Sequence, residues 1–260
     1  MKIVTWNIAG IKARHETLCK WLQQNKPDIV CLQETKSLDD KFPRDTIESL
    51  GYHIEIHGQK SFNGVAILSK KTPDEVIRQL PGNDNDEQAR YIEAVYSTNK
   101  GVIRVASLYL PNGNPIDSEK YLYKMEWMDR LYTHAKSLLA YEEPLILAGD
   151  YNVIPAPIDA RKPQEWTEDA LFLPQTKKAF RRIIHLGFYD AVRSVTDNSS
   201  FSFWDFQAGA WFKNNGIRID HFLLSPEAVD QLISSYSQTE VRGYQKPSDH
   251  TPVWVELNFS

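Results

Sequence analysis

Short runs of almost exclusively apolar residues recur along the whole chain, and each run ends beside a polar motif. Three of these runs occupy residues 3–6, 29–32 and 145–148. Their length and composition are typical of β-strands buried on both faces, as in α/β proteins. Because residues just beyond strand ends converge on one ligand-binding crevice in such sheets, we expect the polar motifs to lie together. They are Trp6-Asn7, Gln33-Glu34-Thr35, Gly149-Asp150-Tyr151-Asn152, Arg218-Ile219-Asp220 and Ser248-Asp249-His250.

The chemistry of these motifs points to a hydrolase that uses a metal ion. Carboxylates that gather without matching basic residues repel one another, so such a cluster indicates a bound cation or a role in proton transfer. The sequence contains no GxSxG elbow, no Walker A motif and no HExxH motif. A serine nucleophile is therefore not expected, and we expect water to attack the substrate directly.

Composition and motif spacing predict one large domain. The chain has 260 residues, of which 42% are hydrophobic and 12% aromatic, which is ample for a substantial core. The polar motifs begin at Trp6 and end at His250, so any division of the chain would split them, and we expect a single domain over residues 1–260. The formal net charge of −4 argues mildly against a nucleic-acid binder, although a local basic rim can still supply phosphate contacts.

The cysteines and the N-terminus predict a cytoplasmic protein with no membrane partner. Cys19 and Cys31 lie in apolar surroundings without CxxC spacing, so we expect free, buried thiols in a reducing compartment. The first apolar run ends at Trp6, which is too short for a signal peptide, and no stretch approaches the length of a membrane span.

The remaining apolar patterns predict a mixture of strands and helices. Hairpin-like connections such as residues 98–101 indicate antiparallel pairing beside parallel strands, so a mixed-sheet α/β sandwich is expected. Further strands are expected at residues 65–68, 92–96, 103–110, 217–224 and 253–257, and helices at 118–139, 175–186 and 226–234. Ser118 is the expected N-cap of the longest helix. We expect its apolar face to be Tyr121, Leu122, Met125, Met128, Tyr132, Ala135 and Leu139.

Two of the motifs carry residues suited to a metal ion and a water nucleophile. Glu34 follows an apolar strand, and a hard cation such as Mg²⁺ prefers oxygen ligands, with Asn7 offering an amide oxygen. If strand geometry continues past Gly149, Asp150 and Asn152 point to the same side. Asp150 can then orient or deprotonate a water, and Asn152 can donate a hydrogen bond to a developing oxyanion.

The last motif supplies a histidine with a candidate orienting carboxylate. Adjacent residues rarely share a role, so Asp249 and His250 are expected to serve different partners. Asp220 is the candidate that fixes the tautomer and orientation of His250. His221 has no comparable companion motif and is expected to be structural.

Taken in order, the segments WNI, LQET, LYLPNG, GDYNV, GIRIDHFLLS and PSDHTPV resemble the exonuclease III family of AP endonucleases. This family lies within the DNase I-like endonuclease/exonuclease/phosphatase superfamily, and the resemblance runs from Lys2 to about Leu257. It implies an α/β fold that is a four-layer α/β sandwich with two packed mixed β-sheets.

The resemblance also implies an activity. The reaction is Mg²⁺-dependent hydrolysis 5′ to an abasic site, leaving a 3′-hydroxyl, with 3′ to 5′ exodeoxyribonuclease and 3′-phosphatase activities that vary between members. Mn²⁺ is expected to substitute for Mg²⁺. The implied partner is double-stranded DNA with abasic sites or blocked 3′ ends, and the protein is expected to be a monomer, associated with the nucleoid in a bacterium.

Individual roles follow from the same resemblance. Metal-binding positions of the family match Asn7, Glu34, Asp150, Asn152 and Asp249. Tyr109 matches a tyrosine that contacts the target phosphate, and Asp150 matches the residue that activates the attacking water. Asn152 matches a stabiliser of the pentacovalent state, His250 the imidazole at the phosphate and Asp220 the carboxylate behind it.

The resemblance places an aromatic pocket for the extruded abasic sugar at Phe203 and Trp204. A nucleotide without a base is cheap to flip out of the duplex. Core packing is the alternative for each aromatic side chain of this segment, namely Phe201, Phe203, Trp204 and Phe206.

Three positions depart from the family pattern and leave substrate preference open. Ala9 stands where relatives often have Asn or Asp near the metal, Gln207 where an Arg is common, and Ile217 where some relatives have a bulkier aromatic residue. One basic helix face is expected either to be solvated or to contact DNA phosphates. It comprises Lys177, Lys178, Arg181 and Arg182.

Two other functions compete with DNA repair. One is hydrolysis of a phosphoinositide or phospholipid head group by another member of the superfamily. The other is a catalytically silent nucleic-acid-binding module on the same fold, although binding alone would not require the intact set Glu34, Asp150, Asn152, Asp220 and His250.

Overall fold

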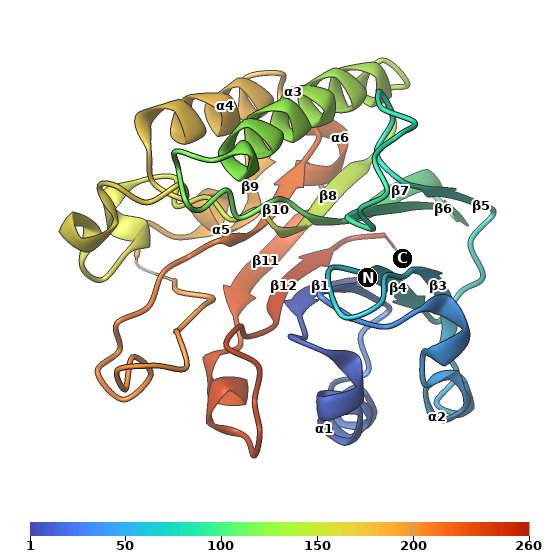
Figure 1. The fold of residues 1–260 in the computed structure, drawn as a ribbon. Helices are drawn as coiled ribbons and strands as arrows, with labels where there is room; N and C mark the ends of the chain where they lie inside the picture. Colours follow the sequence, from blue (N-terminus) through green and yellow to red (C-terminus); the bar gives the residue numbers. More distant parts are fainter. Residues whose placement is uncertain (199, 260) are drawn as a thin grey trace.

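Two six-stranded β-sheets pack face to face in the computed structural model, which describes residues 1–198 and 200–259 (Figure 1). The first sheet has the order β11-β12-β1-β2-β4-β3. Its strands are β1 (Lys2–Asn7), β2 (Ile29–Gln33), β3 (His53–His57), β4 (Val65–Ser69), β11 (Leu232–Ser237) and β12 (Val253–Leu257).

The second sheet has the order β5-β6-β7-β8-β10-β9. Its strands are β5 (Glu75–Arg78), β6 (Tyr91–Thr98), β7 (Gly101–Tyr109), β8 (Leu145–Asp150), β9 (Tyr189–Asp190) and β10 (Asp220–Leu224). One neighbouring pair in each sheet is parallel, β1 with β2 and β7 with β8, and the other pairs are antiparallel. The mixed character expected from the sequence is therefore confirmed.

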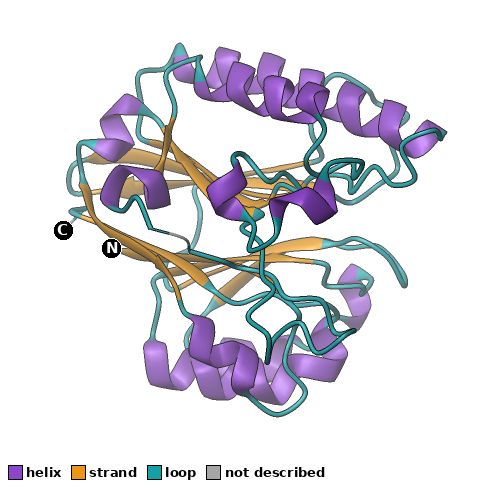
Figure 2. Cartoon of the chain, turned by 90° about the vertical axis from the view of Figure 1, so that its left-hand side faces the viewer, coloured by secondary structure: helices purple, strands orange, loops and turns teal. Residues whose placement is uncertain are grey.

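Helices cover the outer face of each sheet and complete four layers (Figure 2). Helices α1 (Ile11–Asn25) and α2 (Arg44–Ser49) lie on the first sheet, and α3 (Glu119–Leu139) and α4 (Pro174–Ile184) lie on the second. The predicted four-layer α/β sandwich is confirmed. The short elements are α5 (Ala191–Val195), α6 (Pro226–Val229), η1 (Asp39–Lys41), η2 (Pro157–Asp159), η3 (Pro163–Trp166) and η4 (Thr239–Gly243).

The apolar runs of the sequence form central strands with both faces buried. Successive side chains of a strand point to opposite faces, so Ile146 of β8 packs between the sheets while Leu147 packs under α3 and α4. Likewise Ile3 lies between the sheets and Val4 packs against α1. Burial on both sides explains why these runs are continuously apolar and do not alternate with polar residues.

The C-terminal part of the chain contains two departures from the sequence expectations. The helix expected over residues 226–234 was wrong, because α6 ends at Val229 and residues 232–237 pair with β12 as an edge strand. The strand expected over residues 217–224 begins only at Asp220, and Ile217 instead forms isolated bridges with loop residues. In both places pairing with distant segments overrides the local pattern.

Helix α3 begins where expected, and its buried face overlaps the expected one only in part. The Ser118 side chain accepts a hydrogen bond from the N–H of Lys120, as an N-cap does. The expected face included Leu122, which is 63% exposed. Met128 and Ala135 of the expected face are buried, and Met125, Tyr132 and Leu139 are partly buried. The buried residues that were not expected are Lys124, Trp127, Leu131 and Leu138. The lysine on the buried side is a polar residue that a hydrophobicity pattern assigns to the surface.

The strand register brings the polar motifs to one end of the sandwich. Asn7 lies opposite Gln33 at the ends of β1 and β2. Asp150 lies opposite both Tyr109 of β7 and Asp220 of β10. Separately, both cysteines are free and buried, as expected. None of the helices in the described residues combines the length and the apolarity needed to cross a bilayer.

Candidate active site

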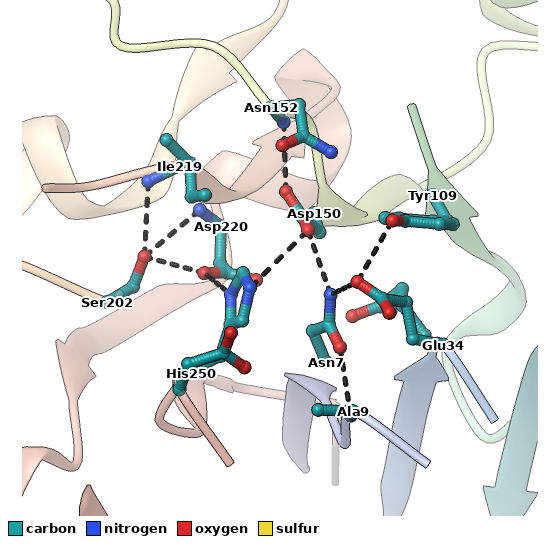
Figure 3. A network of polar contacts seen from close by, with 12 residues as sticks. Asn7, Ala9, Glu34, Tyr109, Asp150, Asn152, Ser202, Ile219, Asp220 and His250 are labelled. Carbon is teal, nitrogen blue, oxygen red and sulfur yellow. Dashed lines mark hydrogen bonds and ion pairs between the residues drawn. The ribbon is translucent and has the colours of Figure 1, made fainter. Parts of the chain in front are cut away.

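Side chains from both sheets meet in one hydrogen-bonded network at this end of the sandwich (Figure 3). Asp150 lies in the middle of the view, with Asn7, Glu34 and Tyr109 on one side and Asp220 and His250 on the other. The five strand-end motifs of the sequence therefore do converge, although they are spread over more than 240 residues of chain.

Asn7 joins two of the three carboxylates that the metal site was expected to contain. Its buried Nδ2 donates to Glu34 Oε1 and to Asp150 Oδ2, both at 2.9 Å. Its Oδ1 accepts the main-chain N–H of Ala9 at 3.0 Å. Asn7 thus presents its NH₂ group to the carboxylates, whereas a role as an oxygen ligand requires the opposite orientation of the amide.

Glu34 is held as an ionised carboxylate. The backbone of Glu34 adopts a left-handed conformation (φ 49°), which turns the chain away from the direction of β2. Its Oε1 also accepts from the Tyr109 hydroxyl at 2.9 Å, and its Oε2 lies 2.7 Å from the Lys36 Nζ. Burial opposes the charge, but hydrogen bonds from Asn7 and Lys36 outweigh it and lower the pKa of Glu34.

Asp150 is the buried centre of the network. Its Oδ1 accepts the main-chain N–H of Asn152 at 2.9 Å, while Oδ2 accepts from Asn7. Burial raises the pKa of Asp150 to about 7; the charge of His250 opposes this rise and the charge of Asp220 adds to it. A carboxyl poised near neutrality is suited to proton transfer.

Asn152 leaves the line of the strand. Asp150 and Asn152 were expected to point to the same side if the strand continued past Gly149. Strand β8 ends at Asp150, however, and Asn152 has a left-handed φ of 47°, so the strand geometry does not continue as far as Asn152. The Asn152 Nδ2 donates to the Leu110 carbonyl at 2.9 Å. The main-chain carbonyl of Asn152 accepts a hydrogen bond from the Nζ of Lys124, a fully buried residue, at 2.7 Å.

His250 is oriented by Asp220, as expected. Its Nδ1 lies 2.8 Å from Asp220 Oδ2, and its Nε2 lies 3.7 Å from Asp150 Oδ2. Burial opposes a charged imidazole, but Asp220 and Asp150 prevail and raise the pKa of His250 to about 10. The histidine is therefore an imidazolium at neutral pH.

Ser202 belongs to this network although no sequence motif indicated it. Its Oγ donates to Asp220 Oδ2 at 2.6 Å and accepts the main-chain N–H groups of Ile219 and Asp220, both at 3.1 Å. These contacts fix the carboxylate behind His250. The only sequence signal was the position of Ser202 in an aromatic segment, which carries no indication of this contact.

The two aromatic residues expected to line a sugar pocket lie in different surroundings. The Phe203 ring is partly buried, 4.9 Å from the His250 ring, and so borders the network. Trp204 is buried in a separate cluster with Phe201 and packs edge-on against Trp211. A cavity of about 500 Å³ adjoins that cluster.

His221 lies on the other side of β10 and has a structural setting. Its Nε2 lies 2.9 Å from the Val153 carbonyl and its Nδ1 lies 3.0 Å from Arg218. Arg218 in turn pairs with Asp159 at 2.7 Å and with Asp190 at 2.8 Å. The expectation of a structural role for His221 fits this closed set of contacts.

Several donors suited to a cation are grouped at the site. Single ligand atoms of Asp150, Asp220 and His250 all lie within 4.8 Å of one another. Glu34 is connected to this group through Asn7, and Asp249 is half-buried beside it, where its Oδ1 accepts from Ser248 Oγ at 3.3 Å. Carboxylate oxygens are the ligands that hard cations prefer.

The basic helix face lies on α4, in the outer layer above the second sheet. The Lys177 Nζ stands 3.6 Å from the centre of the Phe172 ring, and Arg182 pairs with Asp129 of α3 at 2.8 Å. At least these two cations already have partners within the protein, which favours the solvated alternative for this face.

Comparison with known proteins yields consistent relatives over the whole chain. The model of the Endonuclease/Exonuclease/phosphatase family matches residues 4–250. Exodeoxyribonuclease III of Haemophilus influenzae is 33% identical over 269 aligned residues, covering 99% of this chain and 100% of the relative. An AP endonuclease structure from Archaeoglobus fulgidus has 35% identity and a TM-score of 0.93, with 99% of each chain covered.

A further solved structure is that of a 3′ phosphatase from Neisseria bound to a product DNA hairpin. It has 34% identity and a TM-score of 0.95, again with 99% of each chain covered. These similarities agree with the order of the sequence motifs and with the geometry of the network. The chain therefore belongs to the exonuclease III family of AP endonucleases, within the endonuclease/exonuclease/phosphatase family, and is a phosphodiester hydrolase of DNA repair.

Proposed function

We propose that this protein is a Mg²⁺-dependent endonuclease that cleaves DNA 5′ to abasic sites, with 3′ to 5′ exonuclease and 3′-phosphatase activities. The observation that carries the proposal is the convergence of the Asp220–His250 pair on Asp150, with Glu34 linked to Asp150 through Asn7. The relatives named above as an exodeoxyribonuclease, an AP endonuclease and a 3′ phosphatase support each of the three activities.

The donor set fits a hard divalent cation. Glu34 and Asp150 share one amide donor, and the buried Oδ1 of Asp220 has no hydrogen-bond partner among the described residues. Glu34, with Asp150, Asn7, Asn152 and Asp249, would hold the ion. When bound, Mg²⁺ supplies positive charge at the phosphate and lowers the pKa of water.

The residues of the chain can carry out the remaining chemistry. Asp150 accepts a proton from the attacking water, whose oxygen forms the new bond to phosphorus as the bond to the 3′-oxygen breaks. The 3′-oxygen leaves with the bonding electrons and takes up a proton to give the 3′-hydroxyl. The imidazolium of His250, held by Asp220, neutralises charge on the non-bridging oxygens as it develops.

Two neighbours complete the proposed machinery. Burial and the charges of Glu34 and Asp150 raise the pKa of Tyr109, so its hydroxyl stays protonated and can donate to a phosphate oxygen. Asn152 is held near Asp150 by its own N–H and is proposed to stabilise the pentacovalent state. Phe203, at the edge of the His250 ring, is the better supported wall for an extruded sugar, because Trp204 is buried in a separate cluster.

Cleavage of a defined duplex tests the proposal. The substrate carries one tetrahydrofuran abasic analogue, and it is incubated with Mg²⁺ or with EDTA beside an intact duplex. Mg²⁺-dependent nicking 5′ to the analogue is expected, and the intact duplex reports the accompanying exonuclease activity. If folded protein nicks neither duplex and instead releases phosphate from an inositol phosphate, the proposal is wrong.

A further inference from the structure

A groove of about 350 Å³ lies beside the active site, between the loop over residues 205–212 and the turn over residues 242–247. The floor of the groove is continuous with the catalytic segment, because Pro247 lines it and immediately precedes Ser248-Asp249-His250. The segments that flank the two walls are also hydrogen-bonded to each other at the site. Trp204, which directly precedes the loop over residues 205–212, donates its main-chain N–H to the Asp249 carbonyl at 2.9 Å.

The walls of this groove carry aromatic side chains that the fold leaves uncovered. Phe212 is 92% exposed, Phe206 is 54% exposed and Tyr244 is 36% exposed, and all three line the groove. Exposed aromatic residues that cluster on one surface mark a binding site more often than chance placement does. Three such rings within one groove are not required by the core, which is complete without them.

Arg242 places a buried cation in the same groove without a counter-ion. It is only 7% exposed, and its Nε has no hydrogen-bond partner among the described residues. Its guanidinium donates to the Trp204 carbonyl at 3.2 Å and lies 5.1 Å from the Phe206 ring centre. Burial lowers the pKa of Arg242, and the negative charges of Asp249 and Asp205 only partly offset this decrease. Neither carboxylate forms an ion pair with Arg242 within 4.0 Å in the described chain.

A second arginine approaches the same ring from α1. The Arg14 guanidinium lies 6.0 Å from the Phe206 ring centre, and its buried Nε likewise has no partner among residues 1–198 and 200–259. Its other nitrogens donate to the carbonyls of Ala9 and Pro247, which do not neutralise the charge. Two guanidinium groups therefore lie near one exposed aromatic ring, and Arg14 also reaches Pro247, three residues before His250. Arg242 is buried and Arg14 partly buried, and positive charge in such positions favours an anionic ligand.

We propose that this groove binds an unpaired nucleotide of the DNA strand that the enzyme processes. The base stacks on Phe212 and Tyr244, and its phosphate faces Arg242 and Arg14. Only an unpaired base has free faces for stacking between aromatic side chains, since a paired base is covered by its neighbours in the duplex. Asp205 also lines the groove and acts on Arg242 at longer range. The anionic backbone matches Arg242 and Arg14, neither of which has a carboxylate at ion-pair distance in the described residues, and an apolar protein partner would leave them so.

A neighbouring groove extends the same surface. It has a volume of about 890 Å³ and shares Tyr244 with the first groove. Its lining contains three lysines, Lys12, Lys20 and Lys246, and one acidic residue, Glu16, so its charged residues are mainly basic. A single strand that leaves the aromatic groove would follow this basic surface, as single strands do on proteins that combine stacking platforms with a basic channel.

Binding in EDTA tests the groove without cleavage. Fluorescence anisotropy compares a labelled blunt duplex with the same duplex carrying four unpaired nucleotides at a 3′ or a 5′ end. We expect at least about 5-fold tighter binding of one extended duplex, since stacking of a single base supplies a factor of this order. Phe212→Ala and Tyr244→Ala should each remove most of that gain, and Phe212→Tyr should retain it.

The matched control is Tyr141→Ala, which removes a 63% exposed aromatic ring beyond the C-terminus of α3, at the opposite end of β8 from Asp150. It should keep the preference for the extended duplex. Equal affinity for blunt and extended duplexes, or an unchanged preference in Phe212→Ala, would overturn the inference. The inference rests on the proposed function, whose own failure would appear separately as absent Mg²⁺-dependent nicking of the abasic duplex by the unmodified protein.

Discussion

Two buried charge clusters flank the start of β10, and they differ in their charge balance. In the first, Asp159 and Asp190 are matched by the guanidinium groups of Arg218 and Arg193, and all four side chains are linked by ion pairs. In the second, Asp150 and Asp220 share a single cation, His250. Both clusters are built from similar residues at similar depth, so depth alone does not separate them.

The two histidines of these clusters show what the difference does. His221 and His250 are both completely or almost completely buried. Burial and the positive charge of Arg218 lower the pKa of His221 to about 4, whereas Asp220 and Asp150 raise the pKa of His250 to about 10 against the effect of burial. The sign of the neighbouring charge therefore decides which imidazole is available for chemistry.

The comparison gives a physical criterion for separating a scaffold from a site. A balanced cluster satisfies its own charges and stabilises one arrangement of the loops around it. An unbalanced cluster keeps a surplus of carboxylate that only a cation or a proton can compensate. If this criterion is right, substitutions in the first cluster should change stability, and substitutions in the second should change turnover.

The largest effect is expected from opening the balanced cluster. Arg218→Met leaves Asp190 buried without its partner and removes one partner of Asp159, so we expect a loss of about 3–5 kcal/mol in the free energy of unfolding. Urea unfolding at pH 7 measures it. Arg182→Met, which removes a partly exposed arginine from its pair with Asp129, should cost less than about 1 kcal/mol. Equal losses in the two variants would remove the scaffold role from the cluster.

The pH dependence of stability tests the same cluster. The pKa of His221 is about 4 in the folded protein, below the ordinary value of 6.5. Between these values the unfolded chain binds a proton that the folded protein does not, so stability falls as the pH drops through this window. The full effect is about 3 kcal/mol. Urea unfolding between pH 7 and pH 4 should show that the free energy of unfolding falls less steeply with decreasing pH in His221→Gln than in the unmodified protein. The same dependence on pH in both proteins would contradict the lowered pKa of His221.

Turnover should respond only to the unbalanced cluster. Asp150→Asn and His250→Ala each remove a group that we propose to act on the proton or on the phosphate charge, so kcat on the abasic duplex should fall by at least about 100-fold. Anisotropy in EDTA should show DNA binding largely intact. His221→Gln is the matched histidine control and should stay within about 3-fold of the unmodified protein. A comparable loss in that control would erase the distinction between the two clusters.

Metal dependence should separate Glu34 from carboxylates elsewhere on the surface. Glu34→Ala removes the carboxylate that Asn7 and Tyr109 hold in place, so the Mg²⁺ concentration for half-maximal rate should rise by about 10-fold or more. Glu55→Ala, which breaks a pair with Arg78 in another part of the sandwich, should leave that concentration unchanged. An unshifted Mg²⁺ titration in Glu34→Ala would exclude it as a ligand.

The sequence predicted the strand-end residues well because their position follows from the apolar runs that precede them. Asp150 and Glu34 could be placed at one crevice as soon as the strands were recognised. Asp220 could be named as the candidate partner of His250, and the family resemblance implied the same pair. Long-range pairing was not predictable in the same way. The edge strand over residues 232–237 exists because β12 lies beside it, and a local pattern cannot contain that information.

Contacts that depend on the conformation of the backbone were also not predictable from the sequence. The left-handed turn at Asn152 sets where its side chain points, and the carbonyls around Lys124 explain how a lysine can occupy the buried face of α3. Hydrogen bonds to main-chain groups leave no mark in composition or periodicity. For the same reason the role of Ser202 was not predicted, because its contacts with the site are to two main-chain N–H groups and one carboxylate oxygen.

The smallest effect tests whether that serine belongs to the unbalanced cluster. Ser202→Ala removes the hydroxyl that fixes Asp220, so the orientation of His250 loosens and kcat should fall by about 3- to 10-fold. This is less than the full loss of one hydrogen bond to a charged group, because Ser202 acts only through Asp220. The KM for DNA should not change, because Ser202 acts through Asp220 and not on the substrate. Ser202→Thr keeps a hydroxyl and should recover part of the loss.

Ser235→Ala provides the matched control for this prediction. Ser235 is also buried and its Oγ also donates a hydrogen bond, to the Trp254 carbonyl at 2.8 Å, but it lies in the edge strand β11, away from the network. Its loss should lower stability slightly without changing kcat. A change in KM alone in Ser202→Ala, or equal kcat values in the two alanine variants, would show that Asp220 keeps its position without Ser202 and that the unbalanced cluster ends at the carboxylate.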